Sequence, residues 1–383
     1  MNACGCGDDR AVRERRSMKR VSIKPQWTIR FPDGKSLPPR LLDLLAQVQE
    51  HGSLSAACQK AGTSYRHAWD LIRQGEALFG AGLLQMERGR GSRLTALGDK
   101  LVRADQRILA RLAPGLESLA SELETEIESV LHLEPVLLRV HASHGFAIET
   151  LFDLLQAAGI GFDRKYVSSL EAPAALRDGA CDLAGFHIPM GAQERPALSH
   201  YRRWMDPTRH VIVDMATRRQ GLMVAPGNPL KIYEPRDLLR SDVRFINRQR
   251  NSGTRFLLEG LMADSAVDPD RISGFEQGEF THAAVAAYVA SGMADVGFGL
   301  ETPARRFKLD FIPLANERYF LMCEAPALER PAMREVVAIL QGAAFRAIVD
   351  ALPGYDARHA GRVMRLPDAF PSLSLDDQAS TAS

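Results

Sequence analysis

The sequence lacks any apolar run long enough to cross a membrane, since none reaches the roughly 18 residues that a spanning helix needs. The segment MNACGCGDDRAVRERRSMKR has no apolar stretch after its charges, so it does not resemble a secretory signal. Cysteine is scarce and odd in number, five in 383 residues, which argues against a disulfide framework. These absences favour a cytoplasmic protein without a membrane partner.

Familiar catalytic motifs are missing as well. The chain has no GxSxG, no HExxH, no P-loop GxxxxGK[ST] and no GxGxxG after a strand. Cys181 and Cys323 fall within apolar, strand-like runs, where packing is a better interpretation than nucleophilic chemistry. Cys4 and Cys6 form a CxC pair, but a structural metal site needs about four ligands and no second Cys or His cluster lies nearby. We therefore expect no enzyme activity, no metal and no cofactor.

Charge is unevenly distributed, although the net charge is only +1. Residues 1–111 hold 20 Lys/Arg against 11 Asp/Glu, a net of +9, and residues 112–383 hold 28 against 36, a net of −8. A basic end joined to an acidic remainder indicates that the first part binds a polyanion and the second does not. At ~100–200 residues per domain, the length predicts two or three domains.

The basic end has the element order of a winged helix-turn-helix. Helical spacing and caps predict three helices in RLLDLLAQVQEHG, SLSAACQKAG and TSYRHAWDLIRQGEALFG, and LLQMERGRGSRLTALG predicts two short strands around a basic tip. WTIRF alternates like a further short strand. Any small three-helix domain is the alternative, but cations lie on the third helix and in the tip, where groove and phosphate contacts need them. The predicted DNA-binding residues are Ser53, Thr63, Ser64, Tyr65, Arg66, His67, Arg73, Arg88, Arg90 and Arg93.

Residues 27–112 resemble the DNA-binding domain of the ModE molybdate regulators. The resemblance rests on GSLSAACQKAGTSYRHAWDLI, and RGRGSRLTALG is similar to the family's wing and strand end. Its most specific pattern comprises Gly62, Ser64, Tyr65, Ala68, Trp69 and Asp70. LysR-type relatives share the general layout but not Ser-Tyr-x-x-Ala-Trp.

A long amphipathic helix is predicted next, bent at Pro114. Its apolar positions are Leu97, Leu101, Ile108, Leu112, Leu116, Leu119, Leu123 and Ile127. A small winged domain is too small to cover such a stripe, so we expect a homodimer or a dimer of dimers on a two-part operator. Packing against the chain's own C-terminal domain is the alternative.

After LHLEP, strand-like and helical segments alternate, which predicts parallel βαβ units with a ligand beyond the carboxyl ends of the strands. Residues 136–356 resemble the molybdate-binding-protein-like regulatory domains with a type 2 periplasmic-binding-protein fold, two α/β lobes around a cleft. VRFINRQRNSGTRFLLE is the most specific stretch, and HASHGFAIETLFDLL, DLAGFHIP and ADVGFGLE support it. The fold class is therefore α/β, preceded by a winged helix-turn-helix and a long helix.

Three strand ends supply the candidate ligand site. A helix that begins in RQRNSGTRFLLE offers free N–H groups, hydroxyls and a cation to an oxyanion, and Gly253 permits close backbone approach. The predicted ligand residues are Ser143, His144, His187, Arg250, Ser252, Gly253 and Thr254. The alternatives are a plain capped helix, structural histidines, and an Arg248 that only forms an ion pair.

We therefore predict a bacterial regulator with a disordered basic tail (1–24), a winged helix-turn-helix (25–95), a dimerisation helix (96–132), an anion-sensing domain (133–366) and a second disordered tail (367–383). The resemblance implies molybdate or tungstate as effector. The first loop reads Ala-Ser-His-Gly and is not hydroxyl-rich, which departs from the molybdate binders and leaves the identity of the anion open. Formate or another small carboxylate is the second candidate, because two histidines at the cleft suit a planar anion. A cytoplasmic anion-binding or enzymatic α/β protein with a basic interaction module is the remaining alternative.

Overall fold

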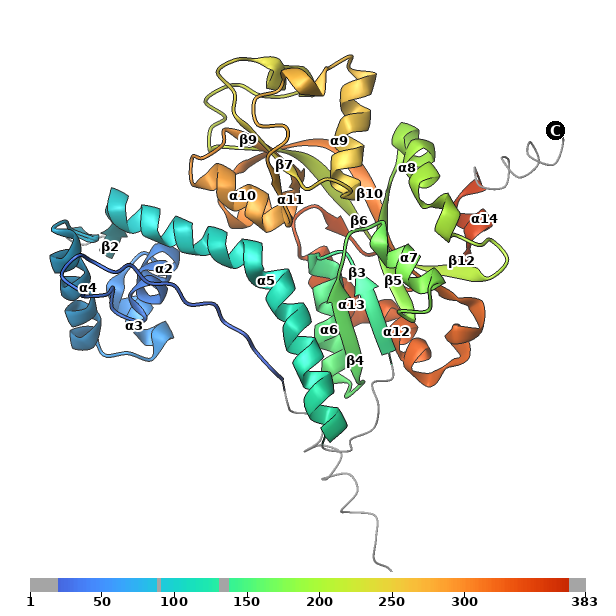
Figure 1. Cartoon of the computed structure of the whole chain (residues 1–383), viewed down its shortest axis with the longest axis horizontal. Coiled ribbons are helices and arrows are strands. Elements are labelled where there is room, and N and C mark those ends of the chain that lie inside the picture. The colour runs from blue at the N-terminus through green and yellow to red at the C-terminus, as the bar shows by residue number, and fades with distance from the viewer. Residues whose placement is uncertain (1–19, 88–90, 131–137, 372–383) are drawn as a thin grey trace, which may run out of the picture.

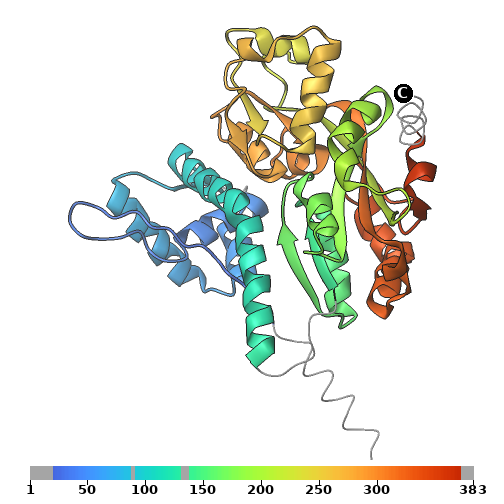
Figure 2. The same cartoon turned by 45° about the vertical axis from the view of Figure 1, so that its right-hand side comes forward.

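The computed structural model describes residues 20–87, 91–130 and 138–371. A small helical domain and a larger α/β domain lie apart, and one long helix, α5, connects them (Figures 1 and 2). Cys4 and Cys6 lie outside the described residues, as do Arg88 and Arg90 of the wing. Among the described helices, none is both long and apolar enough to span a bilayer.

The small domain has the predicted winged helix-turn-helix order. It consists of α2 (Leu41–His51), α3 (Leu54–Ala61), α4 (Tyr65–Phe79) and an antiparallel hairpin of β1 (Leu84–Glu87) and β2 (Gly91–Leu94). Ser53 Oγ accepts the Ala56 N–H at 3.1 Å and Ser64 Oγ accepts the His67 N–H at 3.2 Å, so serine caps begin α3 and α4. Gly62 has a left-handed φ of 61° between them, which makes the turn tight.

WTIRF does not form the predicted strand, since this part of the described chain has only an isolated bridge between Arg30 and Ser36. Its alternation has another cause. Residues 21–31 are extended with every second side chain half-buried, and Trp27 Nε1 donates to Asp105 Oδ1 on α5 at 2.7 Å. The pattern therefore reports packing of an extended arm and not strand pairing.

The α/β domain is one sheet in the order β4-β3-β5-β10-β6-β9-β7-β8. Its strands are β3 (Leu138–Ala142), β4 (Phe162–Tyr166), β5 (Leu183–Pro189), β6 (His210–Val224), β7 (Phe245–Arg248), β8 (Gly278–Glu279), β9 (Val296–Leu300) and β10 (Asp310–Glu324), with β11 (Tyr355–Asp356) and β12 (Val363–Arg365) beside β6. Its helices are α6 (Phe146–Ala157), α7 (Glu171–Arg177), α8 (Glu194–Tyr201), α9 (Gly253–Asp264), α10 (His282–Ala290), α11 (Glu301–Arg306), α12 (Pro331–Gln341), α13 (Ala343–Asp350) and α14 (Leu366–Ala369).

Two lobes share this sheet. Parallel pairs join β4, β3 and β5 in lobe 1 and β9, β7 and β8 in lobe 2, as the alternation of strands and helices predicted. The long strands β6 and β10 pair antiparallel and run through both lobes, which the sequence analysis did not predict. Each lobe has its own apolar core, so the lobes can move about β6 and β10. This is the predicted type 2 periplasmic-binding-protein fold.

Helix α5 (Ala96–Val130) contains Pro114 and bends between its two halves, as both views show. Leu101 and Val102 pack into the core of the winged domain. One face of the remainder packs against α10 and β4 of the chain's own α/β domain, which had been the alternative to dimerisation. Another set of apolar side chains on α5 stays exposed: Leu109, Leu112, Leu119, Leu123, Ile127 and Val130.

Candidate functional site

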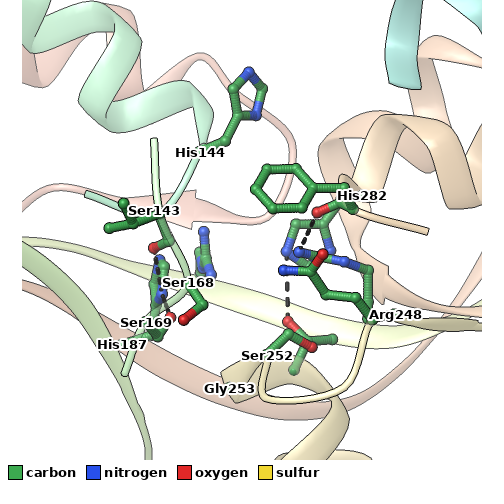
Figure 3. Close-up of a pocket in the computed structure, with 14 residues that line it drawn as sticks. Ser143, His144, Ser168, Ser169, His187, Arg248, Ser252, Gly253 and His282 are labelled. Carbon is green, nitrogen blue, oxygen red and sulfur yellow. Dashed lines mark hydrogen bonds between the residues drawn. The ribbon is translucent and has the colours of Figure 1, made fainter. Parts of the chain in front are cut away.

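A cavity of about 20 Å³ lies between the lobes, room for one or two water-sized groups. Lobe 1 contributes Ser143, His144, Val167, Ser168, Ser169 and His187, and lobe 2 contributes Arg248, Gln249, Ser252, Gly253, Thr254, Phe280 and His282, with Arg218 from β6. Figure 3 shows the serines and His187 facing Arg248, Ser252 and Gly253 across the gap. Polar side chains dominate this lining.

On the lobe 1 wall, His187 is the centre of a hydroxyl cluster. Its Nδ1 lies 3.1 Å from the Oγ atoms of both Ser143 and Ser169. Burial, together with Arg218 and Arg248, lowers the pKa of His187 well below its usual range, so the imidazole is neutral. Its Nε2 is buried and has no hydrogen-bond partner among the described residues. A neutral ring of this kind can donate one hydrogen bond to a ligand.

On the lobe 2 wall, the N-terminus of α9 opens at the cavity. Ser252 caps the helix, and its Oγ accepts the Arg255 N–H at 3.2 Å. The N–H groups of Gly253 and Thr254 belong to the first turn, where no helical acceptor exists. A Cβ on Gly253 would lie 3.6 Å from Ser169 Oγ of the opposite lobe, so the backbone here faces across the gap. Free N–H groups at such a helix start can bind an anion.

Thr254 and His282 complete this wall. The Thr254 Oγ1 accepts from Gln220 Nε2 at 3.1 Å and lies 3.5 Å from His282 Nε2. Because His282 Nδ1 accepts the Leu300 N–H, its proton belongs on Nε2, facing Thr254. Burial, then Arg248 and Arg218, lower the pKa of His282 well below its usual range. The Thr254 oxygen thus takes two donors, and its own hydrogen is left for a further acceptor.

Arg248 is the buried cation of lobe 2. Its Nε donates to the Glu279 carbonyl at 3.2 Å and its Nη2 to the Phe280 carbonyl at 2.7 Å. Its Nη1 is buried without a hydrogen-bond partner in the described chain. Burial, with the repulsion of Arg218, lowers its pKa to about 9, so the guanidinium is still charged at neutral pH. Burial of a charge with an unused donor is unfavourable, and an anion bound next to it would reduce this cost.

A second cation lies where β6 and β10 pass from one lobe to the other. Arg218 Nε donates to Glu317 Oε1 at 2.5 Å, and Gln220 Nε2 donates to the same oxygen at 2.6 Å. In the sheet, Gln220 of β6 is the register partner of Leu300 of β9, and Glu317 of β10 is the register partner of Pro189 of β5. The Arg218–Glu317–Gln220 cluster therefore lies where β6 and β10 pass from one lobe to the other. The Arg218 side chain lies near Tyr355, and its buried Nη1 has no hydrogen-bond partner among the described residues. Two arginines and one carboxylate leave the site with a positive charge.

The structure places six of the seven predicted ligand residues at this cavity: Ser143, His144, His187, Ser252, Gly253 and Thr254. His144 is the least involved, because its ring points away in Figure 3 and its Nε2 lies 2.8 Å from Glu149 Oε1. Arg250 was a wrong prediction. Its side chain is 77% exposed and pairs with Glu276 at 2.5 Å, so the solvent and a carboxylate satisfy it. Arg248, interpreted as an ion-pair former, faces the cavity in its place.

Sequence reasoning missed Arg218, Ser169 and His282. Ser169 is the last residue of VSS and His282 the last residue of FTH, and each lies at a junction between two segments. A hydroxyl or a histidine at the end of a strand was the signal that could have identified them. Arg218 had no local signal, because it lies inside a long strand that was not predicted.

The second candidate surface is the exposed face of α4. Tyr65, Arg66, His67 and Arg73 are exposed there, and Arg73 lies 6.0 Å from the Trp69 ring. Ser53 and Ser64 are occupied as helix caps, and Thr63 is half-buried. Arg93 on β2 is exposed. Arg66 and Arg73, seven positions apart, therefore lie on the same accessible face of α4, and Tyr65 and His67 are exposed in its first turn.

Comparison with known families supports both domains. Residues 39–99 match the family described as bacterial regulatory helix-turn-helix protein, lysR family, and residues 153–341 match the PBP superfamily domain. The first family is one of regulatory proteins, in agreement with the expectation that the chain is not an enzyme.

Three relatives are similar to parts of the chain. An uncharacterized protein, YvgK, of Bacillus subtilis (strain 168) is 30% identical over 201 residues, 52% of this chain and 65% of that protein. An uncharacterized protein from the 5′ region of a ferredoxin 2Fe-2S gene of Clostridium pasteurianum is 34% identical over 26% of this chain and 88% of that protein. The molybdenum-pterin-binding protein MopB of Rhodobacter capsulatus is 35% identical over 23% of this chain and 34% of that protein. The chain thus spans just under two thirds of the first relative.

Among solved structures, a mutant of OxyR from Corynebacterium glutamicum with bound hydrogen peroxide aligns over 82% of this chain and 94% of its own, with 14% identity and a TM-score of 0.41. The ModE-like part of the sequence-based interpretation goes beyond these matches, whereas the helix-turn-helix and the PBP-like domain are both found. The chain thus joins, through the long helix α5, a helix-turn-helix that matches the lysR family to a domain that matches the PBP superfamily.

Proposed function

We propose that this chain is a dimeric regulator that binds operator DNA and senses a small oxyanion of the molybdate or tungstate class in the cavity between its lobes. One observation carries the proposal. Nη1 of Arg248 is buried, charged and without a partner in the described chain, at a cavity that also receives the N-terminus of α9. A buried, unpaired charge is costly, and a bound anion removes that cost.

The other lining groups suit the same occupant. The Thr254 hydroxyl hydrogen, the N–H groups at the start of α9 and the neutral His187 can all donate, and no carboxylate lines the cavity among the described residues. Anions held by several donors, charge-assisted from arginine, are bound tightly and with defined orientation.

Size and relatives favour a small anion. A cavity of about 20 Å³ would have to widen less for an anion of a few atoms than for a larger organic effector. The MopB relative is named a molybdenum-pterin-binding protein, which supports the molybdate class over other oxyanions. Formate or another small carboxylate is the second candidate, because the two guanidiniums of Arg218 and Arg248 present planar donors to a planar anion.

DNA binding is assigned to the exposed face of α4 and to the wing, including Arg88 and Arg90, which lie outside the described residues. The exposed apolar side chains of α5 are assigned to a second copy of the chain, which would place two winged domains on a two-part operator. An effector alters operator affinity only if it binds the two conformations of the regulator differently, and closure of the lobes about β6 and β10 supplies such a difference.

The test is isothermal calorimetry on the full chain with molybdate, tungstate, sulfate, phosphate, formate and acetate at constant ionic strength. We expect one anion per chain to bind and Arg248→Met to abolish its binding. Arg240→Met is the matched control, since Arg240 pairs with Asp242 at 2.7 Å on the same lobe and does not line the cavity. If none of the six anions binds, or if Arg248→Met binds as well as the parent, the proposal is wrong.

A further inference from the structure

We infer that residues 279–282 couple the cavity to the proline-bent centre of α5, the helix that carries the winged domain. This coupling rests on the proposed function only for the identity of the group that fills the cavity.

The four residues alternate between two surroundings. Phe280 and His282 line the cavity. Glu279 and Thr281 lie on the other side, where Glu279 Oε2 accepts from Arg111 Nε at 2.8 Å and Thr281 Oγ1 donates to the Ala110 carbonyl at 2.9 Å. Glu279 and Thr281 are both almost completely buried, whereas the Arg111 side chain is 53% exposed. Alternate side chains of the four residues that lead from the end of β8 into the start of α10 thus contact the ligand site and the helix α5.

Thr281 contacts the Ala110 carbonyl, which has no helical hydrogen-bond donor. In a helix the Ala110 carbonyl would accept from the N–H of residue 114, four positions on, but that residue is proline and has no N–H. Thr281 supplies the missing donor. The α/β domain therefore engages α5 at the one point inside it where proline has removed a helical hydrogen bond.

Arg248 ties the same segment to the anion site. Its Nε and Nη2 donate to the carbonyls of Glu279 and Phe280, while its Nη1 is the unpartnered donor at the cavity. An anion that draws Nη1 toward itself acts on a guanidinium whose other nitrogens hold residues 279 and 280. Occupancy of the cavity and the position of this segment are consequently linked through one side chain.

Helix α5 also contacts both lobes, on either side of Pro114. Before the proline, Lys100 Nζ and Arg103 Nη1 donate to the Ser291 and Ala290 carbonyls of lobe 2 at 3.0 and 2.5 Å. After it, the Oγ atoms of Ser118 and Ser121 accept the backbone N–H groups of Tyr166 and Arg164 in lobe 1, at 3.1 and 3.0 Å. A movement of one lobe relative to the other must bend α5 near Pro114 or break one of these sets. Bending there costs least, because the helical bond is already absent.

A double-mutant cycle tests the contact at Ala110, read by hydrogen exchange of residues 105–118 in the full chain without any anion. Thr281→Val should speed exchange there about three- to tenfold, the size of one net hydrogen bond. In a Pro114→Ala background, Ala110 regains a helical donor, so the same substitution should have less than about a twofold effect. Thr281→Ser keeps the hydroxyl and should restore the parent rate.

The Thr281 hydroxyl also accepts the Ala284 N–H and so caps α10. Loss of that cap is common to both backgrounds and cancels in the cycle. Equal acceleration in both backgrounds, or no acceleration in the parent background, would overturn the inference.

A second pair of variants tests the link from the cavity. Arg248→Met should speed exchange of residues 105–118 although Arg248 does not touch α5, whereas Ser169→Ala, which alters a cavity residue of lobe 1, should leave it unchanged. No response to Arg248→Met, or an equal response to both variants, would also overturn the inference. Neither the double-mutant cycle nor this pair of variants needs a ligand. If none of the six anions bound, that result would therefore refute the proposed function but not this inference. Where molybdate or formate binds the parent, it should slow exchange of residues 105–118, and Thr281→Val should abolish that protection while leaving binding within about threefold.

Discussion

Thr254 illustrates how much of the site depends on single hydrogen atoms. Its oxygen accepts from Gln220, and His282 lies 3.5 Å away, so the hydroxyl hydrogen is available to an anion. Thr254→Val keeps the shape but removes one hydrogen bond to a charged partner, so anion affinity should fall roughly 10- to 150-fold. Calorimetry with the anion that binds the parent measures the change. Thr208→Val, which removes an exposed hydroxyl bonded to Asp206, is the control, and an unchanged affinity in Thr254→Val would leave α9 as a plain capped helix.

The two buried histidines at the cavity predict an acid-sensitive fold. Burial lowers the pKa of His187 and of His282 well below 6.5, the ordinary value that each recovers on unfolding. Their contribution to stability is therefore fully present above pH 6.5 and is lost as the pH falls below it, because only the unfolded chain takes up the protons. Between pH 7.5 and 5.5 each histidine should lower the free energy of unfolding by about 1.4 kcal/mol.

Urea denaturation at the two pH values measures this loss. His187→Gln and His282→Gln should each remove their share of the pH dependence, and His200→Gln, at an exposed histidine, should not. A pH dependence that survived in both buried variants would show that other groups cause it.

At the scale of one element, α5 has one set of side chains that contacts the chain's own lobes and another set that is exposed. Basic and hydroxyl side chains bind the chain's own lobes, whereas Leu112, Leu119, Leu123 and Ile127 are each more than 40% exposed at steps of seven, four and four. Unpaired apolar side chains in such a row are typical of a helix–helix interface. Leu112→Glu together with Leu119→Glu should therefore give monomers, because charge would be buried in that interface.

Light scattering of the purified full chain measures the mass of the double variant. Ile348→Glu is the control, since Ile348 is 46% exposed but lies on α13 of the α/β domain. If the double variant keeps the parent mass, the interface between copies lies elsewhere.

At the scale of the molecule, the uneven distribution of charge favours DNA binding by the basic winged domain and not by the acidic α/β domain. The basic winged domain should bind DNA with a steep salt dependence, and log K should fall by about 0.9 per phosphate neutralised for each unit of log salt. In a dimer, Arg93→Ala should therefore flatten the slope by about 2 and weaken all sequences alike. Arg66→Ala on α4 should instead lose ~1–3 kcal/mol on the operator alone, the value of a base contact.

Fluorescence anisotropy over a salt series, with operator and scrambled duplexes, separates these effects. Arg240→Ala, on the α/β domain, should change neither slope nor specificity. Two arginine variants that bound both duplexes as the parent does would place the DNA-binding surface away from α4 and the wing.

Local signals in the sequence predicted the helices and their caps, because period, cap and turn depend on neighbours within about four residues. Ser53, Ser64, Gly62 and the helix start at Ser252–Gly253 are of this kind. The alternation of strands and helices likewise predicted the lobes and the strand ends that form the cavity. The long strands β6 and β10 escaped prediction, because their pairing joins segments about a hundred residues apart.

By itself, then, the sequence determined the order of the domains, the helix start at the cavity and the charge of each end, all of which depend on composition and short-range spacing. Only the tertiary structure decided which arginine lines the cavity. Arg250 finds Glu276 at the surface, whereas Arg248, at the end of β7, is buried against the carbonyls of Glu279 and Phe280. The same holds for Arg218 with Glu317 and for Thr281 with Ala110, 99 and 171 residues apart, since a donor's partner is set by the folding of distant segments onto one another.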